Sequence, residues 1–157
     1  MTIPFSALSC WSPRVKEHPC DWMPKNIYFS AKEGAVPGYW SHNRFPYSRG
    51  VLDAFTDPEI QQIVLLWGTQ LGKTAILMGL VNYICCNEPS PVMIACPDKG
   101  MAEEVYKTKL EPMLESCPVV ARRLLPKRDR NMHLVDLGDM WVYFGWSGSK
   151  ATLSGRS

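Results

Sequence analysis

Residues 62 to 74 read Gln-Ile-Val-Leu-Leu-Trp-Gly-Thr-Gln-Leu-Gly-Lys-Thr, and this stretch decides which fold the sequence predicts. Its first half is a short apolar run with β-branched residues, which is typical of a buried strand. Its second half is a loop bounded by Gly68 and Gly72 and closed by Lys73 and Thr74. A strand, a glycine-bounded loop and the start of a helix together build a phosphate-binding loop, whose backbone N–H groups surround an anion.

Each residue type in such a loop has a chemical role. Gly72 lets the backbone approach the anion closely, which a Cβ would hinder. Lys73 is predicted to place its ammonium on the β- and γ-phosphate oxygens of a nucleotide, and the Thr74 hydroxyl to hold Mg²⁺. The match to G-x-x-x-x-G-K-[ST] is imperfect, because Trp67 occupies the first glycine position and Gly68 follows it. The alternative is a plain helix start that carries an exposed lysine.

The sequence after the loop favours nucleotide binding. Residues 75 to 86 form an apolar run suited to a helix packed on a sheet, and residues 91 to 97 predict a second buried strand. Strand, loop, helix and strand in this order are the βαβ context of a phosphate-binding loop. The predicted fold class is therefore α/β, with a RecA/ASCE-like P-loop NTPase core in which helices flank a mostly parallel sheet.

Composition limits the class of protein. The chain has 157 residues, of which 46% are apolar and 20% charged, so it can form one domain with a packed core. A net charge of +2 is too small to indicate nucleic-acid binding by itself. The six cysteines include no C-x-x-C pair and are expected to be reduced, with Cys10 and Cys20 best placed for a zinc site or a disulfide. No apolar stretch is long enough to span a bilayer, and the amino terminus does not resemble a signal peptide.

Residues 1 to 45 are rich in proline and tryptophan without sustained periodicity, so an irregular arm is expected there. Its aromatic side chains could stack on nucleobases or anchor the arm to its own domain. A short helix is predicted over residues 47 to 55. A longer helix is predicted over about residues 100 to 116, capped by Asp98 and bent or ended at Pro112.

A basic turn and a hairpin follow. The turn comes after a short helix predicted over about residues 119 to 125, and its cations could contact DNA phosphates or simply be solvated. These cations are Arg122, Arg123, Lys127, Arg128 and Arg130. Residues 132 to 137 and 140 to 146, joined by Gly138 and Asp139, predict a β-hairpin. Residues 147 to 157 contain no apolar run followed by Asp-Glu, so we expect either a shortened chain or nucleotide binding without efficient hydrolysis.

These segments in their order resemble the N-terminal part of the ATPase domain of phage terminase large subunits, in the lambda-like GpA group. The resemblance covers about residues 36 to 157. It rests on residues 37–40, 45–59, 70–74, 97–98, 110–113 with Pro118, and 149–157. The irregular arm of residues 1 to 45 is thus followed over residues 46 to 157 by an ATPase portion, which the resemblance implies to lack the Walker B acidic pair and the nuclease domain.

The resemblance also implies a function. Such a protein is an ATP-driven motor that moves double-stranded DNA into a procapsid, with ATP and Mg²⁺ as cofactors. The implied partners are the terminase small subunit, the portal protein and further copies of the full-length chain, with no membrane. The implied location is the cytoplasm of the bacterial host.

The resemblance assigns roles to individual residues. Lys73 is implied to be catalytic and to bind phosphate, and Thr74 to bind Mg²⁺. Tyr47 is similar to an aromatic residue that packs near the adenine, although it could equally be the core anchor of its own helix. The remaining nucleotide-binding residues implied by the resemblance are Gly68, Thr69, Gln70, Leu71 and Gly72.

Two other functions fit the same residues: a helicase-like P-loop DNA motor, and a non-enzymatic DNA-binding or interaction module. The resemblance further implies that the strands between the loop strand and the second strand come later in the sequence. Strand edges without neighbours are costly. We therefore expect the sheet to be incomplete and the 157-residue chain to be marginally stable.

Overall fold

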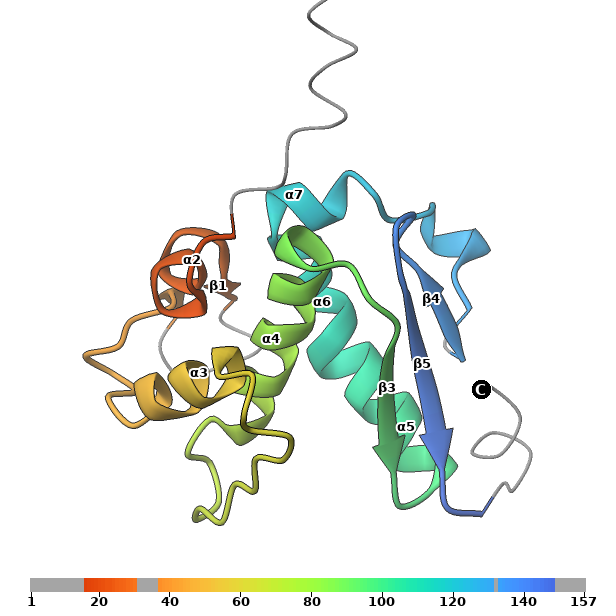
Figure 1. Cartoon of the computed structure of the whole chain (residues 1–157). Coiled ribbons are helices and arrows are strands. Elements are labelled where there is room, and N and C mark those ends of the chain that lie inside the picture. Colours follow the sequence, from red (N-terminus) through yellow and green to blue (C-terminus); the bar gives the residue numbers. More distant parts are fainter. Residues whose placement is uncertain (1–15, 31–36, 132, 149–157) are drawn as a thin grey trace, which may run out of the picture.

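The computed structural model describes residues 16–30, 37–131 and 133–148. Figure 1 shows helix α4 at the centre, with α2 and α3 on one side of it and a small sheet on the other. Helix α5 lies against strands β3 and β5 of the sheet, and α6 lies beside α4 (Figure 1). In chain order the elements are α2 Pro19–Asn26, β1 Tyr28–Phe29, β2 Gly38–Tyr39, α3 Ser48–Thr56, α4 Lys73–Asn87, β3 Val92–Cys96, α5 Lys99–Val105, the π-helical turn η2 Tyr106–Leu110, α6 Glu111–Ser116, α7 Pro118–Ala121, the 3₁₀ turn η3 Lys127–Asp129, β4 Leu134–Asp136 and β5 Trp141–Trp146.

The sheet is mixed rather than mostly parallel. Its strand order is β3-β5-β4, with β5 parallel to β3 and antiparallel to β4. The buried side chains of Val142 and Phe144 point from β5 toward the helical layer, where the Tyr106 ring meets the Phe144 ring edge-on. On the opposite face Met93 and Trp141 are each 46% exposed. The described part of the chain therefore has an α/β architecture, as the sequence predicts.

The predicted hairpin is confirmed. Strands β4 and β5 pair in the register Leu134 to Tyr143, and the turn between them contains Gly138 with a φ of 84°. A left-handed residue of this kind is strained for any side chain with a Cβ, which explains the glycine. The Asp136 carboxylate accepts a hydrogen bond from the Gly138 N–H at 2.8 Å and fixes the turn.

The strand predicted ahead of the loop does not form, so this expectation was wrong. Residues 60 to 68 belong to no strand, and the side chains of Val64 and Leu66 are 63% and 89% exposed. A strand needs a neighbour to satisfy its backbone groups. The facing strand, β3, lies at the edge of its sheet, across an apolar groove of about 540 Å³ from residues 60 to 65. Among the described strands, β3 therefore pairs on one side only, with β5.

The N-terminal arm is not irregular throughout, which corrects a second expectation. Residues Pro19–Asn26 form helix α2, with proline in its first turn and the His18 side chain accepting a hydrogen bond from the Cys20 N–H. Proline suits the first turn because no intrahelical partner is available there. Trp22 is buried edge-on against Tyr83 of α4, with ring centroids 5.7 Å apart. Trp22, and likewise Phe29 and Trp40, anchor the described part of the arm in the core; Trp11 lies outside the described residues.

The helix predicted from about residue 100 to 116 is present, but it contains a π-helical turn. Asp98 caps it as expected, because its carboxylate accepts a hydrogen bond from the Met101 N–H at 2.9 Å. Pro112 falls in the first turn of α6, directly after the wider turn η2. A proline ring clashes with the carbonyl four residues earlier in a regular helix. A π turn ahead of it changes that spacing and lets the helix continue.

Arg130 connects the basic turn to helix α6. Its Nη1 donates to Glu111 Oε1 at 2.9 Å and to Glu115 Oε1 at 2.6 Å, and its side chain is only 11% exposed. Lys127 lies 3.1 Å from the same Glu115 oxygen. Burial acts to raise the pKa of Glu115, but hydrogen bonds from Arg130 and Lys127 outweigh it and hold the pKa below its usual value.

Arg123 is also engaged with the protein itself. Its Nη1 donates to the Cys85 carbonyl at 2.9 Å and lies 3.4 Å from a carboxylate oxygen of Asp139. Arg123, Lys127 and Arg130 therefore all pair with carboxylates. The basic turn does not present these three cations as a free positive surface.

Replacing Arg130 with methionine is expected to lower the free energy of unfolding by about 1–3 kcal/mol, because two partly buried carboxylates lose their partner. Denaturant unfolding measures this, with the exposed Arg122→Met as the control. A carboxyl whose pKa is lowered by folding stabilises the protein above its unfolded pKa and loses this effect as the pH falls. The difference in the free energy of unfolding between the wild type and Arg130→Met should therefore become smaller at acidic pH. Equal stability of the two variants at neutral pH would contradict the assignment.

The described cysteines agree with the expectation of reduced thiols. Cys20, Cys85, Cys86, Cys96 and Cys117 are all free in the structure. Cys10, which was considered with Cys20 for a disulfide, lies outside the described residues. Among the helices that the structure describes, none is both long enough and apolar enough to cross a membrane.

Candidate functional site

The loop ahead of α4 has two residues with left-handed backbone. Gln70 has a φ of 60° and Gly72 a φ of 77°, and they flank Leu71. Left-handed residues next to right-handed ones turn backbone N–H groups toward a common anion. Gly72 is also the N-cap of the 15-residue helix α4, whose positive end therefore opens at the loop.

Glycine is required at position 72 for a second reason. A Cβ built on Gly72 would lie 3.2 Å from the ring of Phe45, tighter than an ordinary van der Waals contact. Phe45 itself packs against Trp40 in the core, with ring centroids 5.3 Å apart. Phe45, which precedes α3, thus packs against both the loop at Gly72 and the core at Trp40.

The Lys73 side chain folds back across the loop. Its Nζ donates to the carbonyl oxygens of Trp67 at 2.8 Å and Gly68 at 2.7 Å. Trp67 stands at the first glycine position of the G-x-x-x-x-G-K-[ST] pattern, and Gly68 directly follows it. The ammonium is therefore held at the loop rather than extended into solvent, which differs from the plain helix start with an exposed lysine.

Tyr47 contacts the loop directly. Its hydroxyl donates to the Leu71 carbonyl at 3.0 Å, and its ring meets the Trp67 ring edge-on with centroids 4.8 Å apart. It precedes α3, which begins at Ser48, within one residue of the predicted helix start. The side chain is exposed rather than buried under its own helix. Tyr47 thus contacts the loop, and its ring also meets Phe45, with centroids 6.3 Å apart.

A cavity of about 510 Å³ opens at the loop. Ligand sites commonly have volumes of about 300–1,000 Å³. The structure places part of the predicted site at this cavity, but Tyr47, Gly68 and Thr69 are not among the residues that line it. Lining residues from the loop and α4 are Gln70, Leu71, Gly72, Lys73, Thr74, Ala75 and Met78, joined by Phe29, Lys109 and Met113.

Lys109 is a candidate that sequence reasoning did not assign to the site. It lies in η2, the π-helical turn, which contacts α4. A second lysine at the same cavity as Lys73 increases its attraction for anions. Nothing in the local sequence marks Lys109, because its position depends on how η2 packs against α4.

Residues 34–157 match the family model of the phage terminase large subunit gpA, ATPase domain. The chain belongs to this family. It is similar to the terminase large subunit of Escherichia phage lambda, with 24% identity over 98 residues, and to that of Enterobacteria phage P21, with 22% identity over 99 residues. These alignments cover 62% and 63% of this chain, and the chain spans about 15% of the length of both relatives. No solved structure matches.

The family assignment confirms the resemblance read from the sequence. The matched range contains the whole loop and every lining residue of the cavity except Phe29, so most of the cavity lies within the gpA ATPase domain. Helix α2 and Phe29 precede the matched range. These segments are packed on the gpA domain by the aromatic anchors described above.

Proposed function

We propose that the loop of residues 68 to 74 binds the triphosphate of ATP, in a RecA/ASCE-like P-loop NTPase core. In this proposal the N–H groups around Leu71 surround the phosphates and the start of α4 adds its positive dipole. Lys73 contacts the β- and γ-phosphate oxygens, exchanging its bonds to the Trp67 and Gly68 carbonyls for charged acceptors. Tyr47 holds Leu71 through the hydrogen bond to its carbonyl, and its proposed role is to pack near the adenine.

One observation carries the proposal. A loop with two left-handed residues, at the start of a 15-residue helix, opens onto a 510 Å³ cavity that two lysines line. Backbone donors and cations on one cavity wall fit a polyanion. The apolar side chains of Met78 and Met113 on the same cavity limit the access of water.

Mg²⁺ fits the second residue of α4. Thr74 lines the cavity next to Lys73, and a hydroxyl at this position can provide one oxygen ligand for a magnesium ion that also contacts phosphate. Hydrolysis needs in addition a carboxylate to activate water. The sequence after the loop contains no apolar run ending in Asp-Glu, so we expect this chain to bind ATP with negligible turnover.

For the whole protein we propose the role of an ATP-driven motor that moves double-stranded DNA into a procapsid in the cytoplasm of a bacterial host. Its proposed partners are the terminase small subunit, the portal protein and further copies of itself. The support is the family assignment of residues 34–157. In this scheme the chain supplies the ATP-binding portion, and the described part of the arm of residues 1–45 packs on it.

Nucleotide titration by calorimetry, in the presence of Mg²⁺, tests the ATP site. ATP is expected to bind at one site per chain, and AMP, which lacks the β- and γ-phosphates, is expected to bind at least about tenfold more weakly. Equal affinity for ATP and AMP would show that the phosphate tail does not contact the loop. The absence of ATP binding to the folded chain would reject the proposal.

Lys109→Ala is expected to weaken ATP binding by about two- to tenfold, less than a change at Lys73, because Lys109 is an exposed cation that a flexible stem holds at the cavity. The difference in ATP affinity between the wild type and Lys109→Ala should fall as the salt concentration rises. Lys107→Ala is the matched control, since Lys107 lies two residues away and pairs with Glu103 at 3.5 Å. If Lys107→Ala weakens binding as much as Lys109→Ala, then Lys109 has no specific role.

The structure does not favour a DNA-binding module built on the basic turn, since three of its cations are paired with carboxylates. Salt-dependent DNA binding by this chain without any effect of ATP would support that alternative. A helicase-like motor shares the proposed loop chemistry, and the family assignment is the observation that favours the terminase motor over it.

A further inference from the structure

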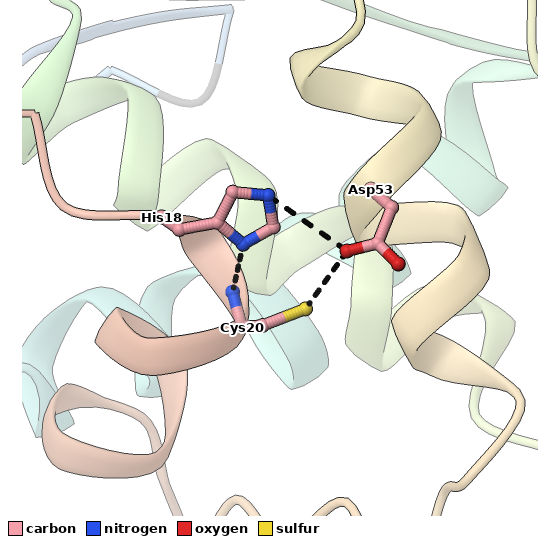
Figure 2. A group of neighbouring side chains, drawn as sticks. All are labelled: His18, Cys20 and Asp53. Atoms are coloured by element: carbon pink, nitrogen blue, oxygen red, sulfur yellow. Dashed lines mark hydrogen bonds and ion pairs between the residues drawn. The ribbon is translucent and has the colours of Figure 1, made fainter.

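Three potential metal ligands of different types meet between helices α2 and α3. Figure 2 shows His18 and Cys20 at the start of α2 and Asp53 reaching toward them from α3. Cys20 Sγ lies 3.5 Å from Asp53 Oδ1, and His18 Nε2 lies 3.8 Å from the same oxygen. One nitrogen of the imidazole, the thiol sulfur and a carboxylate oxygen all lie within 4.8 Å of one another.

We propose that His18, Cys20 and Asp53 bind a zinc ion. Tetrahedral zinc holds sulfur at about 2.3 Å and nitrogen or oxygen at about 2.0 Å, so its ligand atoms lie roughly 3.3–3.6 Å apart. The 3.5 Å between Cys20 and Asp53 already fits this range, and the imidazole, which has one nitrogen within 4.8 Å of both other ligand atoms, must move closer to complete the site. A thiolate with an imidazole selects zinc over magnesium and calcium, which prefer oxygen ligands.

The hydrogen bonds of His18 identify the nitrogen that can bind the ion. Nδ1 accepts from the Cys20 N–H, which in a neutral ring leaves the proton on Nε2, 3.0 Å from Thr56 Oγ1. The Thr56 hydroxyl in turn donates to the Asp53 carbonyl at 2.9 Å, which leaves its oxygen free to accept from Nε2. The Nδ1 lone pair makes only a long contact of 3.3 Å with the Cys20 amide. Zinc would replace that contact, while Thr56 keeps the ring oriented, as an outer-shell partner does in known zinc sites.

The site is accessible and has room for a fourth ligand. The side chains of His18 and Asp53 are 39% and 65% exposed, and Cys20 is half-buried. Three protein ligands leave one position of a tetrahedral ion open to water. Because Asp53 is an exposed residue of α3, removing its charge should leave the fold intact.

The bound ion would link two parts of the chain that the family match separates. His18 and Cys20 precede the matched range of residues 34–157, whereas Asp53 lies inside it. Helix α3 begins directly after Tyr47, whose hydroxyl holds the loop carbonyl of Leu71. Zinc at this position would therefore link the start of α2 to α3, the helix that follows Tyr47 and its contact with the loop. The zinc site stands independently of the proposed ATP site.

Metal titration of the 157-residue chain, after treatment with a chelator, tests the proposal. One Zn²⁺ per chain is expected to bind in calorimetry, with release of protons. Co²⁺ in its place should give a thiolate charge-transfer band, which Cys20→Ser should abolish. Asp53→Asn should weaken Zn²⁺ binding at least about tenfold. Asp21→Asn, which removes the neighbouring exposed carboxylate in the first turn of α2, should leave affinity unchanged.

The unfolding transition of each variant, followed by circular dichroism, separates loss of the site from loss of the fold. If Cys20→Ser is unfolded, Asp53→Asn decides the question, because its side chain is the most exposed of the three. The absence of stoichiometric Zn²⁺ binding to the folded chain would overturn the proposal. So would Zn²⁺ affinity that is the same in the wild type, Cys20→Ser and Asp53→Asn, since the ion would then be bound elsewhere, for example by Cys85, Cys86 and Cys117.

Discussion

Replacing Lys73 with alanine is expected to lower the affinity for ATP by about 10- to 100-fold, because a hydrogen bond from a charged donor is worth about 1.5–3 kcal/mol. In the absence of nucleotide the Lys73 ammonium donates to the Trp67 and Gly68 carbonyls, so the variant also loses two bonds within the loop. Calorimetric titration with ATP measures the first effect. Denaturant unfolding without nucleotide measures the second.

Lys99→Ala is the control for this change. Lys99 begins α5 on the surface, pairs with Glu103 at 3.8 Å, and does not line the cavity. Its replacement should leave ATP affinity unchanged. ATP affinity that is equal in the wild type and in Lys73→Ala would show that the loop does not hold the phosphates, and the proposed function would fail.

Gly72→Val is expected to abolish ATP binding and to lower the free energy of unfolding by about 2 kcal/mol. A left-handed conformation costs about 1–2 kcal/mol for a residue with a Cβ, and β-branched residues are the least suited to it. The new Cβ would also lie 3.2 Å from the Phe45 ring, so the ring or the loop must move. Either movement disturbs the N–H groups that flank Leu71.

Gly50→Ala provides the matched control. Gly50 lies in α3, its φ is not positive, and a Cβ built there meets nothing within 4 Å. This substitution should raise the free energy of unfolding by about 0.5–1 kcal/mol, because glycine is entropically costly in a helix. ATP affinity should stay the same. If Gly72→Val bound ATP as well as Gly50→Ala, the loop backbone could not be the phosphate site.

The parts of the fold that were predicted correctly have strong local signals. Gly138 favours a turn between the two strand segments, Asp98 is a good N-cap, and the apolar run after Thr74 is long enough to favour a buried helix over a strand. Helix α2 was missed because Pro19 was interpreted as a sign of irregular structure. In the structure it occupies the first helical turn, where proline is favoured.

The errors concern contacts between distant residues. The apolar run of residues 62 to 67 has the composition of a strand, but a strand also needs a neighbour, and the described residues provide none on that side. Lys109 and Lys73 are far apart in the sequence and meet only because η2 packs on α4. His18 and Asp53 likewise come from different helices. Local patterns carry no information about such pairs.

The open side of strand β3 has a consequence for handling the protein. Backbone groups along β3 and the apolar residues across the groove, Ile63 and Leu65, form a template on which an extended peptide can be added. At the concentrations used for calorimetry, intermolecular strand pairing and slow fibril growth would compete with the folded monomer. Light scattering should therefore rise with concentration, and a short β-strand peptide that occupies this edge should suppress it.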